Sequence, residues 1–404
     1  MIDFDYTATQ KNLREMIHWF AENEIRPISL QSDREHAVPE AFLRKVVEMG
    51  IGGGVIPKPM GGEGEGAGEE TDARGSKQGN RFAIIGAEET SWGDAGVIMN
   101  FPGPGLGGPP IRFMGTKEQK ERFFGVFKPG TIKYGAYGLT EPGAGSDVAG
   151  IRTSCRKDGQ DWVLNGTKCF ITNGGKADWV VIFATADAAQ GRAGHRAFVV
   201  EKGTPGFRLG KIEDKMGLRA SETAELVLED CRVPEENLLG GEDFYRSKEG
   251  FMGAMKTFNS SRPMVAAMAV GIARAALERA RDFVKENYAL GRPLARYRQI
   301  ADLLATDFRL LEAARMMTWR AAWMADDGIP NAAEASMSKA YAAQVGQKCV
   351  TDAMQMCGAA GLVSDAFLEK WFRDMKVFDI FEGTGQIQRI VISKRILRDP
   401  PASF

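Results

Sequence analysis

The spacing of apolar residues changes twice along the chain. Over residues 1–130 and again over 241–404, apolar side chains recur every three to four positions, as on one face of an amphipathic helix. Over residues 131–240 apolar and polar residues alternate, which is typical of β-strands. The pattern predicts an α+β multidomain protein: a helical N-terminal domain, a central all-β domain built as a sandwich or barrel, and a helical C-terminal domain.

The N-terminal domain begins with a strong helix signal. Thr7 and Gln10 form a capping box ahead of an apolar helical repeat, so we expect the chain to be structural from its start, without a signal peptide. Pro39–Met49 predicts a second helix. Gly61–Asn80 is rich in glycine and acidic residues and almost lacks apolar ones, and we expect it to form a flexible surface loop.

In the central domain, Asn165-Gly166 lies between two apolar stretches and predicts a β-hairpin turn. Turn residues separate four further expected strands, which are Trp179–Ala184, Arg196–Glu201, Phe207–Leu209 and Glu225–Leu228. The C-terminal domain has four long alanine-rich stretches, whose small residues favour an antiparallel four-helix bundle. These stretches are Arg262–Asn287, Ile300–Asp326, Asn331–Cys357 and Asp365–Ile380.

Composition excludes several classes of function. The chain has 52 basic and 53 acidic residues, whereas nucleic-acid-binding proteins usually carry a basic surplus. No apolar run reaches the length of a membrane span, and the three histidines are too scattered for a metal site or a serine triad. The five cysteines form no CxxC pair, so we expect reduced core residues in a cytoplasmic protein.

The strongest chemical signal is Glu382, which lies between apolar residues and glycines in the segment Phe378–Arg389. Burial disfavours the charged form of a carboxyl group and raises its pKa. A carboxylate of this kind can remove a proton from carbon near neutral pH. Glu382 is therefore a candidate general base, and the alternative is a solvated glutamate in a loop.

Two further segments offer groups suited to a ligand. In Tyr137–Asp147 the hydroxyls of Thr140 and Ser146 accompany glycines that allow backbone amides to approach a ligand closely. Phe170–Gly175 combines an aromatic ring and a hydroxyl at spacing that suits a planar aromatic cofactor. The alternatives are an elaborate turn and an edge strand. The GxGxxG pattern at 103–108 is surrounded by prolines, so it does not indicate a dinucleotide site.

Four motifs, in order, resemble the acyl-CoA dehydrogenase family over essentially the whole chain. The motifs are Thr140–Asp147, Asn165–Gly174, Lys215–Ser221 and Phe381–Arg389. The resemblance implies a helical N-terminal domain, a central β-barrel and a C-terminal four-helix bundle in a homotetramer. It also implies that FAD oxidises a CoA thioester at Cα–Cβ and that an electron-transfer flavoprotein accepts the electrons. The length, branching and ring content of the acyl group follow from no motif.

The resemblance assigns roles to individual residues. Glu382 is the implied base, because the position used by some relatives holds Ser261, which cannot accept the proton. The implied FAD contacts are Tyr137, Leu139, Thr140, Gly145, Ser146, Phe170, Ile171, Thr172, Gln355, Gly358, Thr384 and Gln386. Of these, Gln355 and Gly358 would reach the FAD of a neighbouring subunit. The implied substrate contacts are Ser146, Asn259, Ser261, Arg262 and Gly383.

The chain departs from the family pattern at Asn287, where relatives carry an arginine that pairs with the FAD pyrophosphate. Exchange of a guanidinium for an amide loses a bidentate phosphate contact. Our hypothesis is that Arg292, Arg296 or Arg298 replaces it, with Arg298 as the first choice. The segment Asn100–Pro110, rich in proline and glycine, indicates either a reshaped acyl pocket or a re-routed surface loop.

Two other functions remain open at this point. One is an oxidase or monooxygenase of the same fold, which peroxide formation without another acceptor would identify. The other is a non-catalytic subunit of a hetero-oligomer, which Asn287 favours and the complete set of motifs opposes.

Overall fold

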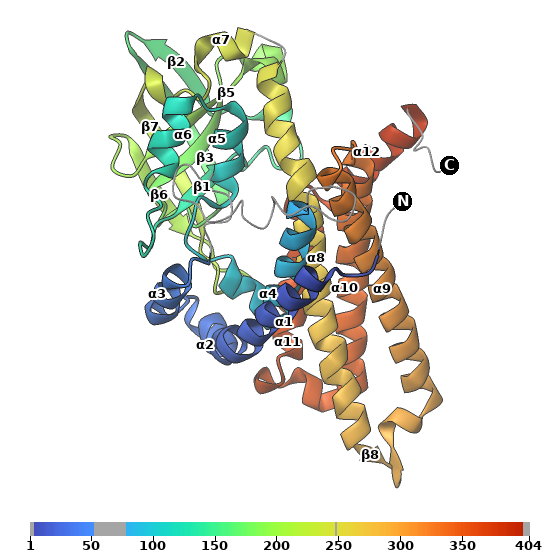
Figure 1. Cartoon of the computed structure of the whole chain (residues 1–404). Helices are drawn as coiled ribbons and strands as arrows, with labels where there is room; N and C mark the ends of the chain where they lie inside the picture. Colours follow the sequence, from blue (N-terminus) through green and yellow to red (C-terminus); the bar gives the residue numbers. More distant parts are fainter. Residues whose placement is uncertain (1–3, 52–77, 247–248, 399–404) are drawn as a thin grey trace.

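The computed structural model describes residues 4–51, 78–246 and 249–398, and it has the expected helical, β and helical parts in chain order (Figure 1). The first part contains α1 (Ala8–Phe20), α2 (Arg26–Glu35), α3 (Glu40–Glu48), α4 (Gly79–Ile98), α5 (Gly108–Met114) and α6 (Lys117–Phe124). The capping box at Thr7 and Gln10 is confirmed, and so is the second helix. Of the expected loop at 61–80, residues 61–77 lie outside the described residues and α4 begins at Gly79.

The central domain is a sheet of seven strands. They are β1 (Gly135–Gly138), β2 (Ser154–Asp158), β3 (Asp161–Thr172), β4 (Trp179–Thr185), β5 (His195–Glu201), β6 (Phe207–Ile212) and β7 (Thr223–Pro234). The order is β1-β4-β2-β3-β7-β6, with β5 paired to β4. Among the described residues no pairing joins β6 to β1 or β5, so the expected barrel is a curled sheet that backbone bonds do not close.

The predicted hairpin turn at Asn165-Gly166 is wrong. β3 runs through both residues, and the hairpin with β2 turns instead between Asp158 and Asp161, around Gly159 at φ 68°. At Asn165-Gly166 the pairing of β3 with β7 shifts register, as at a β-bulge. A Cβ on Gly166 would lie 2.4 Å from the Thr153 side-chain oxygen, so this glycine permits close packing inside the sheet.

The sheet has an apolar core on each side. Its inner face buries Trp162, Ile171 and Phe198 with other strand residues. Its outer face buries Trp179 and Val181 against the aromatic residues of α6 and the chain that follows it. Figure 1 shows α5 and α6 lying over this outer face, so these two helices belong to the wall of the β domain.

The C-terminal part contains three long helices, α8 (Glu249–Glu286), α9 (Arg298–Asp326) and α10 (Ala332–Cys357). The short strands β8 (Tyr288–Ala289) and β9 (Arg292–Pro293) form the hairpin that joins α8 to α9. The helices approach closely because small residues line their contacts: a Cβ on Gly271 of α8 would lie 2.2 Å from the Glu88 carbonyl of α4. Short α7 (Gly241–Arg246) precedes α8.

The fourth long helix expected at Asp365–Ile380 is wrong. Phe367 adopts φ 64° and interrupts the chain, so this stretch holds only α11 (Leu368–Met375) with single 3-10 turns on either side. The final helix, α12 (Gly385–Arg398), packs on α10 instead. Among the described residues no helix is both long and apolar enough to cross a membrane.

A buried ionic cluster joins the three parts. The Lys370 ammonium of α11 lies 2.6 Å from Asp94 of α4 and 2.5 Å from Asp374. Asp374 also accepts a bond from the backbone N–H of Leu218, in the loop before β7. Asp94 has φ −169° and interrupts α4, and its carboxylate accepts the N–H of Val97 and so caps the helix end that follows.

Candidate active site

Glu382 lies in the turn between the 3-10 turn Lys376–Asp379 and α12. Its φ of 53° is in the left-handed region, and Gly383 follows at 94°. A non-glycine residue in this region costs about 1–3 kcal/mol, and such residues cluster at functional sites. The turn directs the Glu382 side chain toward α8, where the Ser261 hydroxyl donates a hydrogen bond to its carboxylate.

The surroundings of Glu382 raise the pKa of its carboxyl group. Burial is the largest cause, and it is partly opposed by the Ser261 hydrogen bond and by the positive charges of Arg262 and Lys339. The pKa of Tyr137 on β1 is raised mainly by burial and also by the charge of Glu382. The structure therefore brings together Glu382, Ser261, Arg262 and Tyr137 from three separate parts of the chain.

Sequence reasoning missed Lys339 and Gln388, whose side chains donate hydrogen bonds to the backbone of the Glu382 turn. The Lys339 ammonium of α10 donates to the Gly383 carbonyl at 2.8 Å. The Gln388 amide of α12 donates to the same carbonyl at 2.8 Å and to the Glu382 carbonyl at 3.1 Å. Both side chains are fully buried. A lysine within the alanine-rich stretch Asn331–Cys357 was the available signal, since an isolated buried charge needs a polar partner.

The loop that carries Thr140, Gly145 and Ser146 is held at its base by a second missed pair. Lys168 of β3 is fully buried, and its ammonium lies 2.6 Å from the Glu141 carboxylate. Glu141 also accepts the backbone N–H groups of Arg152 and Thr153, at 2.6 and 2.9 Å. The pair closes the loop on the sheet, while Gly145 and Ser146 themselves are exposed.

The residues near this loop that we expect to contact FAD differ in which of their atoms are accessible to a ligand. The Leu139 side chain is buried in the outer core, and its carbonyl accepts the Lys168 ammonium at 3.1 Å. Phe170 has φ 58° and is 64% exposed, so its ring is presented to the outside of β3. Ile171 points into the sheet interior, so only its backbone can meet a ligand, and Thr172 is half-buried at the end of the strand.

The remaining expected FAD residues lie near both ends of the helical domain. Thr384 accepts the N–H of Ile387 at 3.3 Å and caps α12 close to Glu382, where Gln386 is exposed. Gln355 and Gly358 lie exposed at the end of α10 that is remote from α12. Arg298 starts α9 beside the β8–β9 hairpin, which Figure 1 shows at the opposite end of the long helices from α12.

The arginines near Asn287 differ in their local contacts. Arg298 is 90% exposed in its side chain and lies 3.5 Å from Asp302. Arg292 stacks on the Tyr297 ring and donates to the Arg296 carbonyl. Asn287 itself caps α8 by donating to the Phe283 carbonyl at 2.8 Å. Arg296 and Arg298 thus both have exposed side chains, and Arg298 is the one that begins α9.

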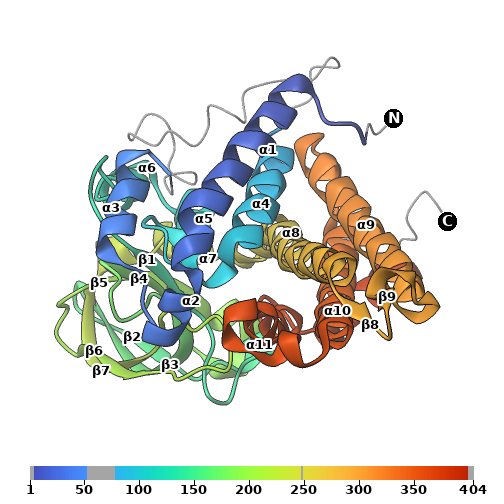
Figure 2. The same cartoon turned by 90° about the horizontal axis from the view of Figure 1, so that it is seen from below.

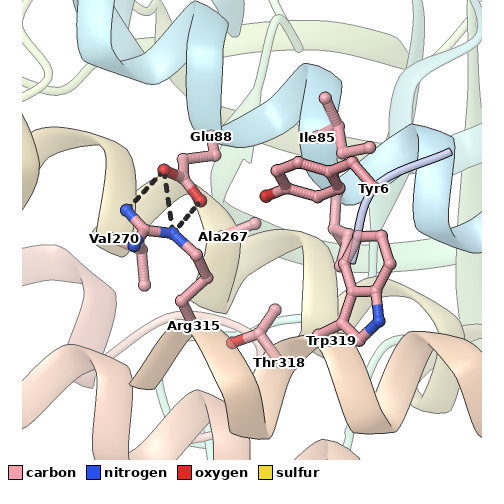
Figure 3. Close-up of a pocket in the computed structure, with 9 residues that line it drawn as sticks. Tyr6, Ile85, Glu88, Ala267, Val270, Arg315, Thr318 and Trp319 are labelled. Atoms are coloured by element: carbon pink, nitrogen blue, oxygen red, sulfur yellow. Dashed lines mark hydrogen bonds and ion pairs between the residues drawn. The ribbon is translucent and has the colours of Figure 1, made fainter. Parts of the chain in front are cut away.

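A small cavity elsewhere in the helical region is not part of this site. It lies between α4, α8, α9 and the N-terminal Tyr6 (Figure 3). Glu88 and Arg315 on its wall pair at 2.9 Å, and Figure 3 shows the Tyr6 ring next to the Trp319 ring, which it meets edge to face with 5.1 Å between ring centroids. None of the residues around Glu382 lines it, so its ion pair joins helices rather than serving the base.

Comparison with known protein families matches all three parts of the chain to the domains of one family. Residues 7–127 match the N-terminal domain of acyl-CoA dehydrogenases, 136–231 the middle domain and 248–397 the C-terminal domain. The chain belongs to the acyl-CoA dehydrogenase family.

Individual relatives cover nearly all of the chain. The short-chain specific acyl-CoA dehydrogenase of Clostridium acetobutylicum is 39% identical, over 98% of this chain and 100% of that protein. The structure of butyryl-CoA dehydrogenase from Megasphaera elsdenii superposes with a TM-score of 0.88 at 36% identity, over 98% of this chain and all of that chain. A chain described as the electron transferring flavoprotein of Acidaminococcus fermentans superposes with a TM-score of 0.87 at 38% identity, over 98% and 100% of the two chains.

Proposed function

We propose that this protein is an FAD-dependent acyl-CoA dehydrogenase in which Glu382 removes the α-proton of a CoA thioester, giving a trans-2-enoyl-CoA. The observation that carries the proposal is the partly buried Glu382 carboxylate, which accepts the Ser261 hydroxyl and has a raised pKa. A general base must be deprotonated at the working pH and still hold a proton well, and a raised pKa brings a carboxylate closer to that balance.

The residues present fit an FAD site. Phe170 offers an exposed ring for stacking, Thr172 a half-buried hydroxyl at the same strand end, and the loop from Thr140 to Ser146 offers backbone amides with open space above Gly143 and Gly145. FAD held there would supply the acceptor for the β-hydrogen of the substrate, which would leave as hydride. The residues proposed to hold it are Tyr137, Leu139, Thr140, Gly145, Ser146, Phe170, Ile171, Thr172, Thr384 and Gln386, with Gln355 and Gly358 for a neighbouring subunit.

The chain's own groups handle the proton. Acidity at Cα depends on donors to the thioester oxygen, and the backbone N–H of Glu382 is the proposed protein donor. Ser261 donates to the Glu382 carboxylate and so fixes one oxygen while the other is available to the substrate. Ser146, Asn259, Arg262 and Gly383 are the further proposed substrate contacts. An acyl chain in the site would exclude water and raise the Glu382 pKa further.

Short acyl groups are the proposed substrates, because relatives at 39% identity are named short-chain specific and a structural neighbour is named for butyryl-CoA. The proposed acceptor of the electrons is an electron-transfer flavoprotein, supported by the structural neighbour described under that name. A homotetramer and a cytoplasmic location are further proposals. All five cysteines are buried and unpaired with one another, as reduced core residues are.

Replacement of Glu382 tests the proposal directly. The flavin absorbance of the wild-type protein should bleach when butyryl-CoA is added without air, whereas Glu382→Gln should keep its yellow colour and bleach about 10²- to 10⁴-fold more slowly, as expected for loss of a general base. Bleaching of the variant at the wild-type rate contradicts the assignment. Rapid peroxide formation by the wild-type protein in air, without another acceptor, would identify an oxidase instead.

The proposed replacement for the missing pyrophosphate arginine is Arg298. Arg298→Ala should release FAD during gel filtration, because the exposed guanidinium would no longer bind a phosphate. Arg208→Ala is the matched control, since Arg208 also pairs with a single exposed carboxylate but lies on β6. Equal FAD retention by the two variants rejects Arg298 as the phosphate partner.

A further inference from the structure

We propose that Lys339 is a positioning residue of the reaction: its buried ammonium fixes the turn that carries Glu382 and stabilises the charged form of that base. The inference rests on the proposed role of Glu382. It assigns to α10, which contributes no residue to the proposed proton transfer, a direct electrostatic part in it.

The geometry places the Lys339 ammonium under the turn rather than in a surface ion pair. The residue is fully buried, and its ammonium donates to the Gly383 carbonyl at 2.8 Å. Gln388 donates to the same carbonyl from α12. The backbone that follows the base is therefore held by two buried donors from two helices.

The turn needs such support because its backbone is strained. Glu382 occupies the left-handed region at φ 53°, which a glutamate adopts rarely when nothing stabilises it. Rotation of the Glu382–Gly383 backbone to an ordinary conformation would turn the Gly383 carbonyl away from Lys339 and Gln388. Both bonds consequently oppose the motion that would swing the carboxylate away from Ser261.

The charges around Lys339 give its ammonium a second effect. Asp379 and Glu382 face it as negative groups and Arg262 as a positive one, while burial lowers the pKa of Lys339 to about 8. Glu382 in turn faces Ser261, Arg262, Lys339 and Tyr137. Lys339 is thus largely charged at neutral pH, and its field lowers the Glu382 pKa that burial has raised.

A purely packing role for this position would not require a lysine. Burial of an ammonium is costly, and an apolar side chain of similar size would fill the space between α8, α10 and α12 without that cost. The Lys339 ammonium is costly to bury at this position, yet its positive charge favours the ionised form of Glu382. This combination is expected of a residue that serves the site rather than the fold.

The test measures proton abstraction alone. Acetyl-CoA has α-hydrogens but no β-carbon, so its exchange with deuterated water, followed by mass spectrometry between pH 5.5 and 9, reports on the base without hydride transfer. Lys339→Met removes both the charge and the donor, whereas Lys339→Gln retains a donor for the Gly383 carbonyl. Lys348→Met is the control on the same helix, because Lys348 pairs with Asp307 and Asp352 away from the turn.

We expect the acidic limb of the exchange profile to move up by about one pH unit in both Lys339 variants, which is about a tenfold loss of rate at pH 6. Lys339→Gln should retain more of the plateau rate than Lys339→Met. Lys348→Met should lower the thermal midpoint without moving the limb. If the acidic limb of the Lys339 variants lies at the same pH as that of the wild-type protein, the inference is overturned. If Lys339→Met fails to fold, the position of the limb in Lys339→Gln decides the question. If the wild-type protein neither exchanges acetyl-CoA hydrogens nor bleaches with butyryl-CoA, the proposed function itself fails.

Discussion

At the scale of single residues, Glu382 owes its properties to residues of the central and C-terminal domains. Ser261 donates a hydrogen bond to its carboxylate, and Arg262 and Lys339 oppose the effect of burial on its pKa, while the Glu382 charge adds to the rise in the pKa of Tyr137. By the family resemblance, Ser261 occupies the position at which some relatives carry the base, and here its hydroxyl donates a hydrogen bond to the Glu382 carboxylate. The Ser261 hydroxyl therefore cannot serve as the base itself, and its hydrogen bond orients the Glu382 carboxylate.

The raised pKa of Glu382 predicts how stability depends on pH. The folded state binds the Glu382 proton more tightly than the unfolded state, so this group contributes stability below its ordinary pKa of 4.5 and loses that contribution as pH rises through the folded value. Each unit of the shift corresponds to about 1.4 kcal/mol.

The Glu382→Gln variant lacks this pH-dependent contribution to the free energy of unfolding. Thermal unfolding should show wild type and variant close together at pH 4.5, with the variant gaining in relative stability by pH 7.5. A gap of the same size at both values would contradict the raised pKa. Glu48→Gln, at an exposed position on α3, gives the background effect of the substitution.

At the scale of elements, the turn between the 3-10 segment and α12 depends on a glycine directly after the base. Gly383 has φ 94°, and a Cβ there would lie 2.6 Å from the Gln388 amide nitrogen. The helices on either side would still form without this turn, since Thr384 caps α12 independently. The turn thus sets where the carboxylate lies, and the helices set where the turn lies.

Gly383→Ala should therefore damage the site more than the fold. We expect a loss of about 1–3 kcal/mol in the free energy of unfolding, from the strained φ, and a marked fall in the bleaching rate. Denaturant titration and flavin absorbance measure the two effects. Gly86→Ala in α4 is the control, because its Cβ would have 3.7 Å to the nearest side chain, and unchanged bleaching by Gly383→Ala would reject the argument.

At the scale of the whole molecule, the Lys370 cluster holds the domains in the relative positions that assemble the site. It joins α4 to α11, and through Leu218 to the β domain, with all three charged side chains almost fully buried. Figure 2 shows α11 lying between the β domain and the long helices. Tyr137 and Glu382 belong to different domains, so their relative position depends on this arrangement.

Lys370→Met should leave Asp94 and Asp374 buried without their cation and destabilise the protein by about 3–5 kcal/mol. The measurement is the denaturant midpoint, followed in parallel by far-UV signal and flavin fluorescence. Arg34→Ala breaks an exposed ion pair with Asp365 and should change stability by less than about 1 kcal/mol. Equal effects of the two substitutions would show that the buried cluster does not hold the domains.

The sequence by itself determined the order of helical and β regions, the cap at Thr7 and the second helix, and it singled out Glu382 as the proposed base, because periodicity, capping chemistry and apolar context act over a few neighbouring residues. It misplaced the hairpin, since Asp158-Gly159 and Asn165-Gly166 are both turn signals and only pairing with β7 decides between them. It also overextended the helix at Asp365–Ile380, where the left-handed Phe367 interrupts the chain. The supports of the site, Lys339–Gly383 and Glu141–Lys168, join residues far apart in the chain, so only the tertiary structure could pair these buried charges with their partners.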